Sequence, residues 1–397
     1  MKRNIADRIQ GAIIMGSVED KINKIKQNKE CRAILAFGSD NFRYFTGACL
    51  PFADNYPERY AVAVILEKGE SFVVSPKEWS EAIKDQGWKG EVIAYDENER
   101  PFPNAFVRTL NEELRKRGLT GKIGYDSSKV AVNIIRSLKE ENTNINLIPI
   151  DHEISEARIV KSRDEVDLIE KASLITERGI IHALNHLEGT LENVGYTIPE
   201  FSERIRVHIF ESGNSGVGML CTTFASDTQF MYAPPRGRFR SGELFRIDVS
   251  SHLKGYWTSI SRMCFSGYVT EEYGSAYNDN LMIKNFAERL LMPEAKCDEI
   301  YQKIIEEAEG KGVECLRPVL GHGVGVSHYE PPFIAKGSSY VLKTGMTLAL
   351  DIATYGPRKE IIRSKDVYEV GNNGCRKLSW YKDWNRIYEV VGFRAMH

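Results

Sequence analysis

The sequence lacks the features that mark most membrane, secreted and nucleic-acid-binding proteins. No apolar run approaches the roughly 20 residues that a membrane-spanning helix needs. The amino-terminal residues have a basic start but only a broken apolar stretch at residues 12–15, so we expect no signal peptide. Lysine plus arginine (53) nearly balances aspartate plus glutamate (55), and the net charge of -2 argues against nucleic-acid binding through bulk positive charge.

Cysteine is present without any pairing pattern. The seven cysteines are odd in number and scattered, and no two of them form a CxxC motif. Because secreted disulfide frameworks and structural zinc sites need regular spacings, we expect reduced thiols in a cytoplasmic protein and no zinc site. Repeats and low-complexity tracts are absent as well. At about 100–200 residues per domain, the 397 residues predict two or three globular domains.

The first 150 or so residues alternate between two kinds of pattern, as is typical of an α/β domain. Short apolar runs favour buried strands at residues 33–37, 60–66, 71–74 and 122–125. Helical spacing extends over residues 105–117 and ends near Gly118, a residue that often terminates helices.

A charged stretch at residues 156–166 separates this domain from the rest. Ser162 followed three residues later by Glu165 is a capping box, which predicts a long helix over about residues 164–185. Further on, strands expected at 244–249 and 257–265 flank a hairpin-length connection around Lys254-Gly255, which indicates antiparallel pairing. We therefore predict an α/β (α+β) protein with one domain at residues 1–155 and a second at residues 156–397.

Four stretches of the second half combine acidic, basic and histidine residues with glycines. They read FRIDVSSHLKGYWTSISR (245–262), GHGVGVSHYEPP (321–332), TGMTLALD (344–351) and IRSKD (362–366). In this order they resemble the creatinase, aminopeptidase P and prolidase superfamily of pita-bread hydrolases, whose patterns are DxGxxxxGYxxDxTR, GHGxGxxxHExP, GMxxxxE and RxED. Residues 40–47 and 158–165 also resemble segments of its amino-terminal domain and linker. The resemblance implies a pita-bread fold for the second domain.

In the metal-dependent members of that superfamily, two aspartates, one histidine and two glutamates hold two divalent ions. The matching positions here are Asp248, Ser259, His322, Asp351 and Lys365. A serine hydroxyl is a poor metal ligand, and a lysine ammonium repels a cation. The summed charge of the five ligand positions is about -4 in the metal-dependent relatives and about -1 here. We therefore expect neither a di-metal centre nor another cofactor. A single ion on Asp248, His322 and Asp351 is the remaining metal alternative.

Lys365 is expected to project into the space that the ions fill in relatives. We expect Asp248 and Asp351 to be its partners, because buried charges in proteins are paired. One interpretation is a salt-bridge network that only maintains the fold. The other is a site in which His322, Lys365, Asp248 and Asp351 perform acid–base catalysis or hold an anionic substrate group.

Two arginines match family positions beside this site. Arg262 and Arg363 can each bind a carboxylate through a guanidinium fork, and together with Lys365 they predict a small-molecule substrate that carries a carboxylate. Glu330 is expected either to contact the substrate or to pair with one of these arginines.

The positions of two family histidines leave further questions open. The catalytic histidine upstream of the first aspartate in creatinase and prolidase has no counterpart, and Tyr232 is the nearest candidate for substrate binding. At the second histidine of GHGxGxxxHExP, counting without gaps gives Tyr329, whereas a backbone bulge would bring in His328 instead. Both residues stay candidates.

Together these observations predict a metal-independent hydrolase of a C–N bond in a small amino-acid-like or amidine-like substrate. Creatinase, which has the same fold without metals, is the precedent. Three alternatives remain: a degenerate Xaa-Pro metallopeptidase, a non-catalytic binding protein, and a lyase like the iron-dependent relatives that cleave C–S bonds. The resemblance also implies a homodimer in which the amino-terminal domain of one subunit closes over the other's cleft. We expect no nucleic-acid or membrane partner.

Overall fold

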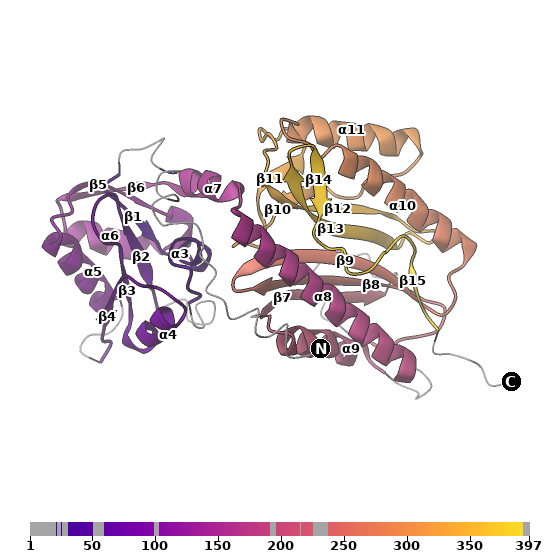
Figure 1. Cartoon of the computed structure of the whole chain (residues 1–397), viewed down its shortest axis with the longest axis horizontal. Coiled ribbons are helices and arrows are strands. Elements are labelled where there is room, and N and C mark those ends of the chain that lie inside the picture. Colours follow the sequence, from indigo (N-terminus) through magenta and orange to yellow (C-terminus); the bar gives the residue numbers. More distant parts are fainter. Residues whose placement is uncertain are drawn as a thin grey trace. The chain divides into compact units, whose positions relative to one another are not determined.

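The computed structural model describes residues 21, 25, 31–50, 59–98, 103–190, 196–214, 216–224 and 237–391. It divides into two compact units, Met1–Arg158 and Ile159–His397 (Figure 1). Each unit has its own β-sheet. No helix among the described residues is both long enough and apolar enough to cross a membrane.

Unit 1 is an α/β domain whose described residues form a six-stranded sheet. In sheet order the strands are β4 (Glu91–Tyr95), β3 (Phe72–Pro76), β2 (Val62–Leu66), β1 (Ala33–Ala36), β5 (Gly121–Tyr125) and β6 (Ile145–Pro149). The pairing is mixed, because β1 is antiparallel to β2 and parallel to β5. The helices are α3 (Ser39–Thr46), η2 (Lys77–Trp79), α4 (Ser80–Asp85), α5 (Asn104–Lys116), η3 (Ser127–Lys129), α6 (Val132–Glu141) and α7 (Asp151–Ile159).

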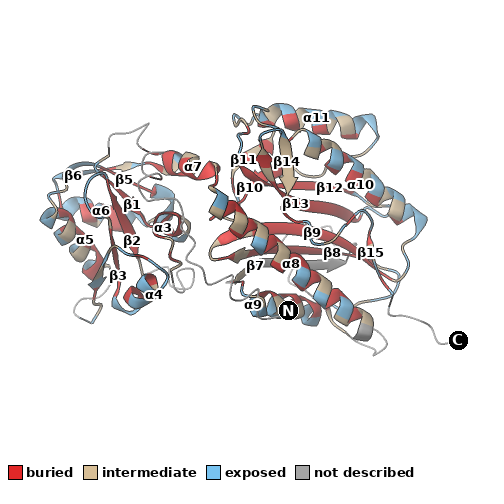
Figure 2. Ribbon diagram, in the orientation of Figure 1, coloured by how far each residue is buried: buried red, intermediate tan, exposed pale blue. Residues whose placement is uncertain are grey.

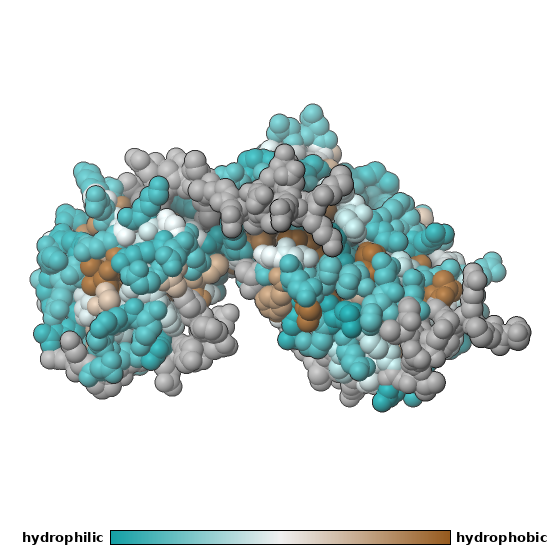
Figure 3. Space-filling view, turned by 60° about the horizontal axis from the view of Figure 1, so that its bottom comes forward, coloured by the Kyte–Doolittle hydropathy of each residue, from teal (hydrophilic) through white to brown (hydrophobic). Residues whose placement is uncertain are grey.

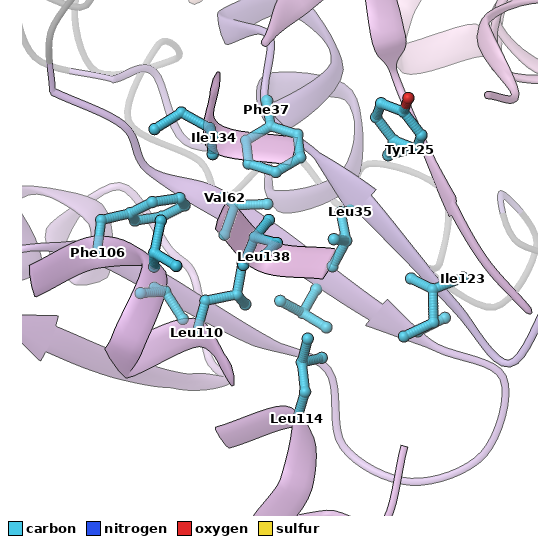
Figure 4. Close-up of a cluster of buried hydrophobic side chains, with 14 of the residues drawn as sticks. Leu35, Phe37, Val62, Phe106, Leu110, Leu114, Ile123, Tyr125, Ile134 and Leu138 are labelled. Carbon is cyan, nitrogen blue, oxygen red and sulfur yellow. The ribbon is translucent and has the colours of Figure 1, made fainter. Parts of the chain in front are cut away.

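The hydrophobic core of unit 1 lies between the sheet and its helices (Figure 4). Helix α5 buries Phe106, Leu110 and Leu114, which recur every four residues and therefore share one face of the helix. These side chains belong to the same cluster as Leu35 and Ile123 of the central strands. The strands and the helix expected from the sequence are confirmed, with boundaries that shift by one or two residues.

The motif at residues 40–47 of unit 1 is explained by hydrogen bonds. Asn41 Nδ2 donates to the buried carboxylate of Asp126 at 2.8 Å, and the same carboxylate accepts from the backbone N–H groups of Phe37 and Gly38. Gly47 ends α3 at φ 77°, a left-handed conformation that favours glycine. These motif residues therefore shape the start and end of α3.

Unit 2 contains a nine-stranded sheet within its described residues. The main path is β11 (Glu330–Ala335), β10 (Val319–Gly323), β12 (Thr347–Tyr355), β13 (Ile361–Gly371), β9 (Tyr256–Ser266), β8 (Leu244–Leu253) and β7 (Gly216–Phe224). β14 (Gly374–Lys377) pairs with β13, and β15 (Tyr388–Val390) pairs with β9. The long central strands are buried almost throughout, as their red colour in Figure 2 shows.

Among the described residues of unit 2, four helices cover one side of this sheet. α8 (Arg163–Thr190) packs on β8 and β9, α9 (Ile198–Glu211) on β7, α10 (Glu271–Arg289) on β12 and β13, and α11 (Cys297–Gly310) on β11 (Figure 1). In Figure 2 these helices alternate between buried and exposed residues, as expected of amphipathic helices on a sheet. On the face shown in Figure 3, hydrophobic side chains of the described residues form only small separate areas.

Two local predictions for unit 2 are confirmed. Ser162 N donates to Glu165 Oε2 at 2.7 Å, and Glu165 N donates to Ser162 Oγ at 3.4 Å, so the capping box begins α8. β8 and β9 form an antiparallel hairpin whose turn residues Lys254 and Gly255 both have positive φ (49° and 83°). That backbone geometry is typical of a two-residue hairpin loop.

Candidate active site

The central sheet of unit 2 carries buried polar residues on both faces, and contacts with the helices show which residue lies on which face. On β13, Asp366 pairs with Lys284 of α10, so it points toward the helices. Arg363 and Lys365 alternate with Asp366 and therefore point to the opposite face, because successive residues of a strand point to opposite sides. We call this opposite face, away from α8 and α10, the site face.

The strand registers place four polar residues in one row on the site face. Asp248 of β8 lies opposite Ser261 of β9, Ser261 lies opposite Lys365 of β13, and Lys365 lies opposite Asp351 of β12. Neighbouring strands are about 4.8 Å apart, so the row spans about 14 Å from end to end. Residues far apart in the chain are thus brought together by strand pairing alone.

Arg363 joins the two aspartates of this row. Its Nε and Nη2 atoms bind Asp351 at 2.7 and 2.6 Å, and Nη1 lies 3.2 Å from Asp248 Oδ2. Burial by itself raises a carboxyl pKa, but Arg363 and Lys365 outweigh it and hold the pKa of Asp351 far below its usual value. The pKa of Asp248 is also lowered, since Arg246 and Arg363 outweigh its burial. Both aspartates are therefore ionised acceptors and poor proton donors.

Further cations surround the same carboxylates. Arg246 Nε donates to Asp248 Oδ2 at 2.7 Å, Arg317 Nε lies 3.3 Å from Asp351 Oδ2, and Lys365 Nζ lies 3.8 Å from that same oxygen. Burial, reinforced by Arg363 and Arg317 and opposed by Asp351, lowers the pKa of Lys365 to about 8. With Lys365 protonated, the three arginines and the lysine exceed the two aspartates by two positive charges among the described residues.

This donor set does not fit the two divalent ions of the metal-dependent relatives. Ser259 and Lys365 occupy two of the five ligand positions, and the remaining carboxylates are already bound by guanidinium groups. Arg363 corresponds to the arginine of the family's RxED segment, so the exchanges at Ser259 and Lys365 are the decisive ones. Among the residues that the structure describes, no three histidine, cysteine or acidic side chains form a cluster that could hold a metal ion.

His322 lies on β10 within the glycine-rich motif. Its Nδ1 atom is 3.0 Å from the backbone oxygen of Gly323, which fixes Nδ1 as the donor and leaves Nε2 as an acceptor. Burial and the positive charge of Lys365 lower the pKa of His322 well below its ordinary value, so the imidazole is neutral. Gly323 is required by close packing, because a Cβ atom there would lie 2.1 Å from the backbone oxygen of Pro331.

The structure distinguishes the two candidates at the second histidine position. His328 Nε2 lies 2.7 Å from Ser250 Oγ, so His328 reaches the site face of β8. Tyr329 is 47% exposed, and its ring lies against that of His322 with a centroid distance of 4.4 Å. An irregular register between β10 and β11 accompanies this arrangement. Both residues therefore stay near the site, but only His328 is hydrogen-bonded to the sheet.

The structure corrects three of the sequence-based expectations. Arg262 does not lie at the site: its guanidinium pairs with Glu177 of α8 and with Asp366, on the helix-covered face. Its distance of three residues from Ser259 is odd, so strand alternation alone indicates that the two point in opposite directions. The partner that links the two site aspartates is Arg363 and not Lys365.

The third correction concerns Glu330, which pairs with neither Arg262 nor Arg363. Glu330 Oε1 accepts a hydrogen bond from Lys161 Nζ at 2.7 Å, and both side chains are buried. The remaining expectation, Tyr232, lies outside the described residues.

Three residues of the site face are not among the site residues that the sequence predicts. Arg246 and Ser250 lie two residues before and two residues after Asp248 on β8, so strand alternation could have placed both beside it. Ser250 also occupies the position that is glycine in the DxG pattern of the family. Arg317 precedes β10 and follows no periodic pattern, so only the structure could bring it to Asp351.

Comparison with known proteins agrees with this architecture. The model of metallopeptidase family M24 matches residues 167–372, and the creatinase/prolidase amino-terminal domain matches residues 20–160. The chain belongs to metallopeptidase family M24. Among curated relatives of this M24 member, uncharacterized peptidases of Staphylococcus aureus (strain MRSA252) and Staphylococcus epidermidis (strain ATCC 12228 / FDA PCI 1200) are each 25% identical to it. They align over 91% of this chain and over 99% and 98% of their own lengths.

Several solved structures share the fold of this M24 protein at low sequence identity. The X-Pro aminopeptidase from Thermotoga maritima MSB8 superposes with a TM-score of 0.80 at 17% identity, covering 94% of this chain and 99% of that one. The Xaa-Pro dipeptidase from Bacillus anthracis gives 0.79 at 17% identity, covering 94% and 100%. The amino-terminal domain of the FACT complex subunit SPT16 from chickpea gives 0.72 at 13% identity, covering 94% and 99%. One fold thus accommodates differently named proteins.

Proposed function

We propose that this M24 protein is a metal-independent hydrolase that cleaves a C–N bond in a small amino-acid-like or amidine-like substrate. The observation that carries the proposal is Lys365 directly opposite Asp351, with Nζ 3.8 Å from Oδ2, at a position where the family pattern has a glutamate. The names of the curated relatives and of the prolidase-like structures support hydrolysis of a C–N bond as the reaction class.

The charges of the site support an anionic group on the substrate. Arg246, Arg317, Arg363 and Lys365 outnumber Asp248 and Asp351, and a buried excess of positive charge is stabilised by an anion. Lys365 and Arg317 bind Asp351 at longer distances than Arg363 does, so they are the groups best able to turn toward a substrate carboxylate.

Acid–base chemistry falls to His322 and Lys365. His322 carries its proton on Nδ1, which leaves Nε2 to accept a proton from a nucleophile or to pass one to a leaving amine. Lys365, with its lowered pKa of about 8, can give or take a proton near neutral pH. Asp248 and Asp351 hold Arg363 in place.

A second candidate is a binding protein without turnover. The observation that favours it is the saturation of both aspartates by arginines, an arrangement that also serves to stabilise a sheet after the metal ligands have been exchanged. Such a protein would bind an anionic ligand through the same cations and release it unchanged.

Assays of the purified full chain distinguish these proposals. The substrates are Xaa-Pro dipeptides, N-acyl and N-carbamoyl amino acids and guanidino acids, each assayed with EDTA and with added Mn²⁺, with amine or ammonia release as the readout. We expect turnover in EDTA that falls about 100-fold in His322→Gln and Lys365→Met. Lys377→Met, which removes a cation paired with Asp366 on the helix-covered face, is the matched control.

The metallopeptidase and binding-protein alternatives have different outcomes. Turnover that requires Mn²⁺ would contradict metal independence and favour a degenerate metallopeptidase. Saturable binding of an anionic compound without turnover would favour the binding protein. From the family resemblance we also propose a homodimer, which light scattering of the purified chain would test.

A further inference from the structure

Ser250 stands on the site face of β8, two residues after Asp248 and opposite Ser259 of β9. It is only 1% exposed. A glycine occupies this position in the DxG pattern that the surrounding motif resembles, so the hydroxyl is a feature of this chain. The pairing of β8 with β9 is continuous through Ser250, whereas the pairing of β8 with β7 shifts register between Val217 and Met219, the partners of Ser251 and Ser250.

The hydroxyl of Ser250 lies within a chain of hydrogen bonds. Ser250 Oγ is 2.7 Å from His328 Nε2 and 3.0 Å from Ser259 Oγ. Burial, with the charges of Lys365 and Arg363, lowers the pKa of His328 to about 4, so the ring is neutral at ordinary pH. With Nε2 as the acceptor, Ser250 donates to His328 and itself accepts from Ser259. A serine that donates to a neutral imidazole is arranged for attack on an acyl carbon.

His328 is held in place from two directions. The turn that precedes it is closed by a hydrogen bond from Gly325 N to Ser327 O at 3.1 Å, and Gly325 O accepts from the backbone N–H of Trp257 at 2.7 Å. The ring of Trp257 packs edge-on against the His328 imidazole, with centroids 5.7 Å apart. The loop is thereby tied to β9, and the imidazole is kept over β8.

We propose that Ser250 is the nucleophile of this site and that His328 is its general base. The inference rests on the proposed C–N hydrolysis. Ser250 Oγ forms a bond to the acyl carbon of the substrate while its proton passes to His328 Nε2. The C–N bond then breaks, and the leaving amine takes that proton. Water, with its proton again accepted by His328, hydrolyses the acyl-serine and regenerates the hydroxyl.

The cations of the site support this chemistry. The tetrahedral intermediate carries a negative charge, and the cations Lys365 and Arg363 add to burial in lowering the pKa of His328. Buried cations that are already in place stabilise a developing oxyanion without further reorganisation. The same negative charge raises the proton affinity of His328 during the step, which offsets the effect of the cations on the free imidazole.

Covalent labelling of the full chain tests the assignment without knowledge of the substrate. Diisopropyl fluorophosphate reacts with an activated serine, which displaces fluoride, and the modified peptide is identified by mass spectrometry. We expect labelling of the wild-type chain at Ser250, none at that position in Ser250→Ala, and a rate about 100-fold lower in His328→Gln. Ser364→Ala, which removes a buried and hydrogen-bonded serine on the helix-covered face, is the matched control and should label normally.

Unfolding curves of each variant check that loss of labelling is not loss of fold. A folded wild-type chain that is not modified at Ser250 overturns the inference. So does a Ser250→Ala variant that keeps wild-type turnover of a C–N substrate, and in that case the proposed function stands. Labelling at Ser250 in a chain that hydrolyses no C–N substrate supports a reactive serine and contradicts the proposed function instead.

Discussion

Lys365 and Asp351 stand directly opposite each other on β13 and β12, with Nζ 3.8 Å from Oδ2. The family patterns carry glutamate at both positions. Two opposed carboxylates repel each other unless cations lie between them, whereas a lysine opposite an aspartate compensates its charge directly. With lysine in place of glutamate at position 365, the charge of Asp351 is compensated without a metal cation.

Replacing Lys365 and Ser259 by the carboxylates of the family pattern should create affinity for divalent ions. In the double variant Lys365→Glu with Ser259→Asp, the site face gains two carboxylates and loses the ammonium. We expect it to bind Mn²⁺ at least about tenfold more tightly than the wild-type chain and to lose native turnover, as measured by titration calorimetry and by the substrate assays.

The control for net charge is Lys303→Glu with Ser275→Asp, which makes the same change at exposed positions of α11 and α10. Equal Mn²⁺ affinity in the two double variants would show that net charge, and not the site face, determines the Mn²⁺ affinity. Native turnover that survives Lys365→Glu with Ser259→Asp would exclude these positions from the chemistry.

Arg363 should be a strong determinant of the stability of unit 2. Arg363→Met removes the group that joins Asp248 to Asp351 and leaves buried carboxylate oxygens without that partner. Breaking a buried pair in this way costs roughly 3–5 kcal/mol in free energy of unfolding. Urea denaturation measures it, and Arg358→Met, at an exposed position between β12 and β13, should stay near wild type. A loss below about 1 kcal/mol would contradict the bridging role.

His328 should contribute to the pH dependence of stability. Its folded pKa of about 4 lies below the ordinary value of 6.5, so the unfolded chain binds the extra proton between these pH values. The stabilisation is therefore present above pH 6.5 and is lost as the pH falls toward 4. In His328→Gln, the curve of unfolding free energy against pH should be flatter over that window. His152→Gln, on the exposed side of α7, should retain the wild-type slope.

Asp126 should stabilise unit 1 through the hydrogen bonds that its carboxylate accepts from three donors. Its carboxylate accepts hydrogen bonds from Phe37 N, Gly38 N and Asn41 Nδ2. Asp126→Asn replaces one acceptor oxygen by an amino group that faces these donors, so we expect a loss of about 1–3 kcal/mol. Thermal unfolding of the variant, compared with Asp85→Asn on the exposed face of α4, provides the measurement. Equal stability of both variants would show that the carboxylate is not required.

Much of the fold could be predicted because its signals are local. The capping box at Ser162 and Glu165 and the hairpin turn at Lys254-Gly255 depend only on nearby residues, and both formed as expected. Strand alternation is an equally local signal: it points Arg262, three residues after Ser259, away from the site, whereas the family position alone predicts the wrong face for Arg262. The same rule places Arg246 and Ser250 on the face of β8 that carries Asp248.

The sequence by itself determined the two-domain pita-bread architecture and the presence of Ser259 and Lys365 at two of the family's metal-ligand positions, because residue type and spacing are enough for both. Only the tertiary structure decided that Arg363 joins the aspartates, that Arg317 approaches Asp351, and that His328 reaches Ser250. Those contacts depend on strand registers and on a turn anchored to β9. Registers are set by pairing between distant segments, so no local pattern specifies them.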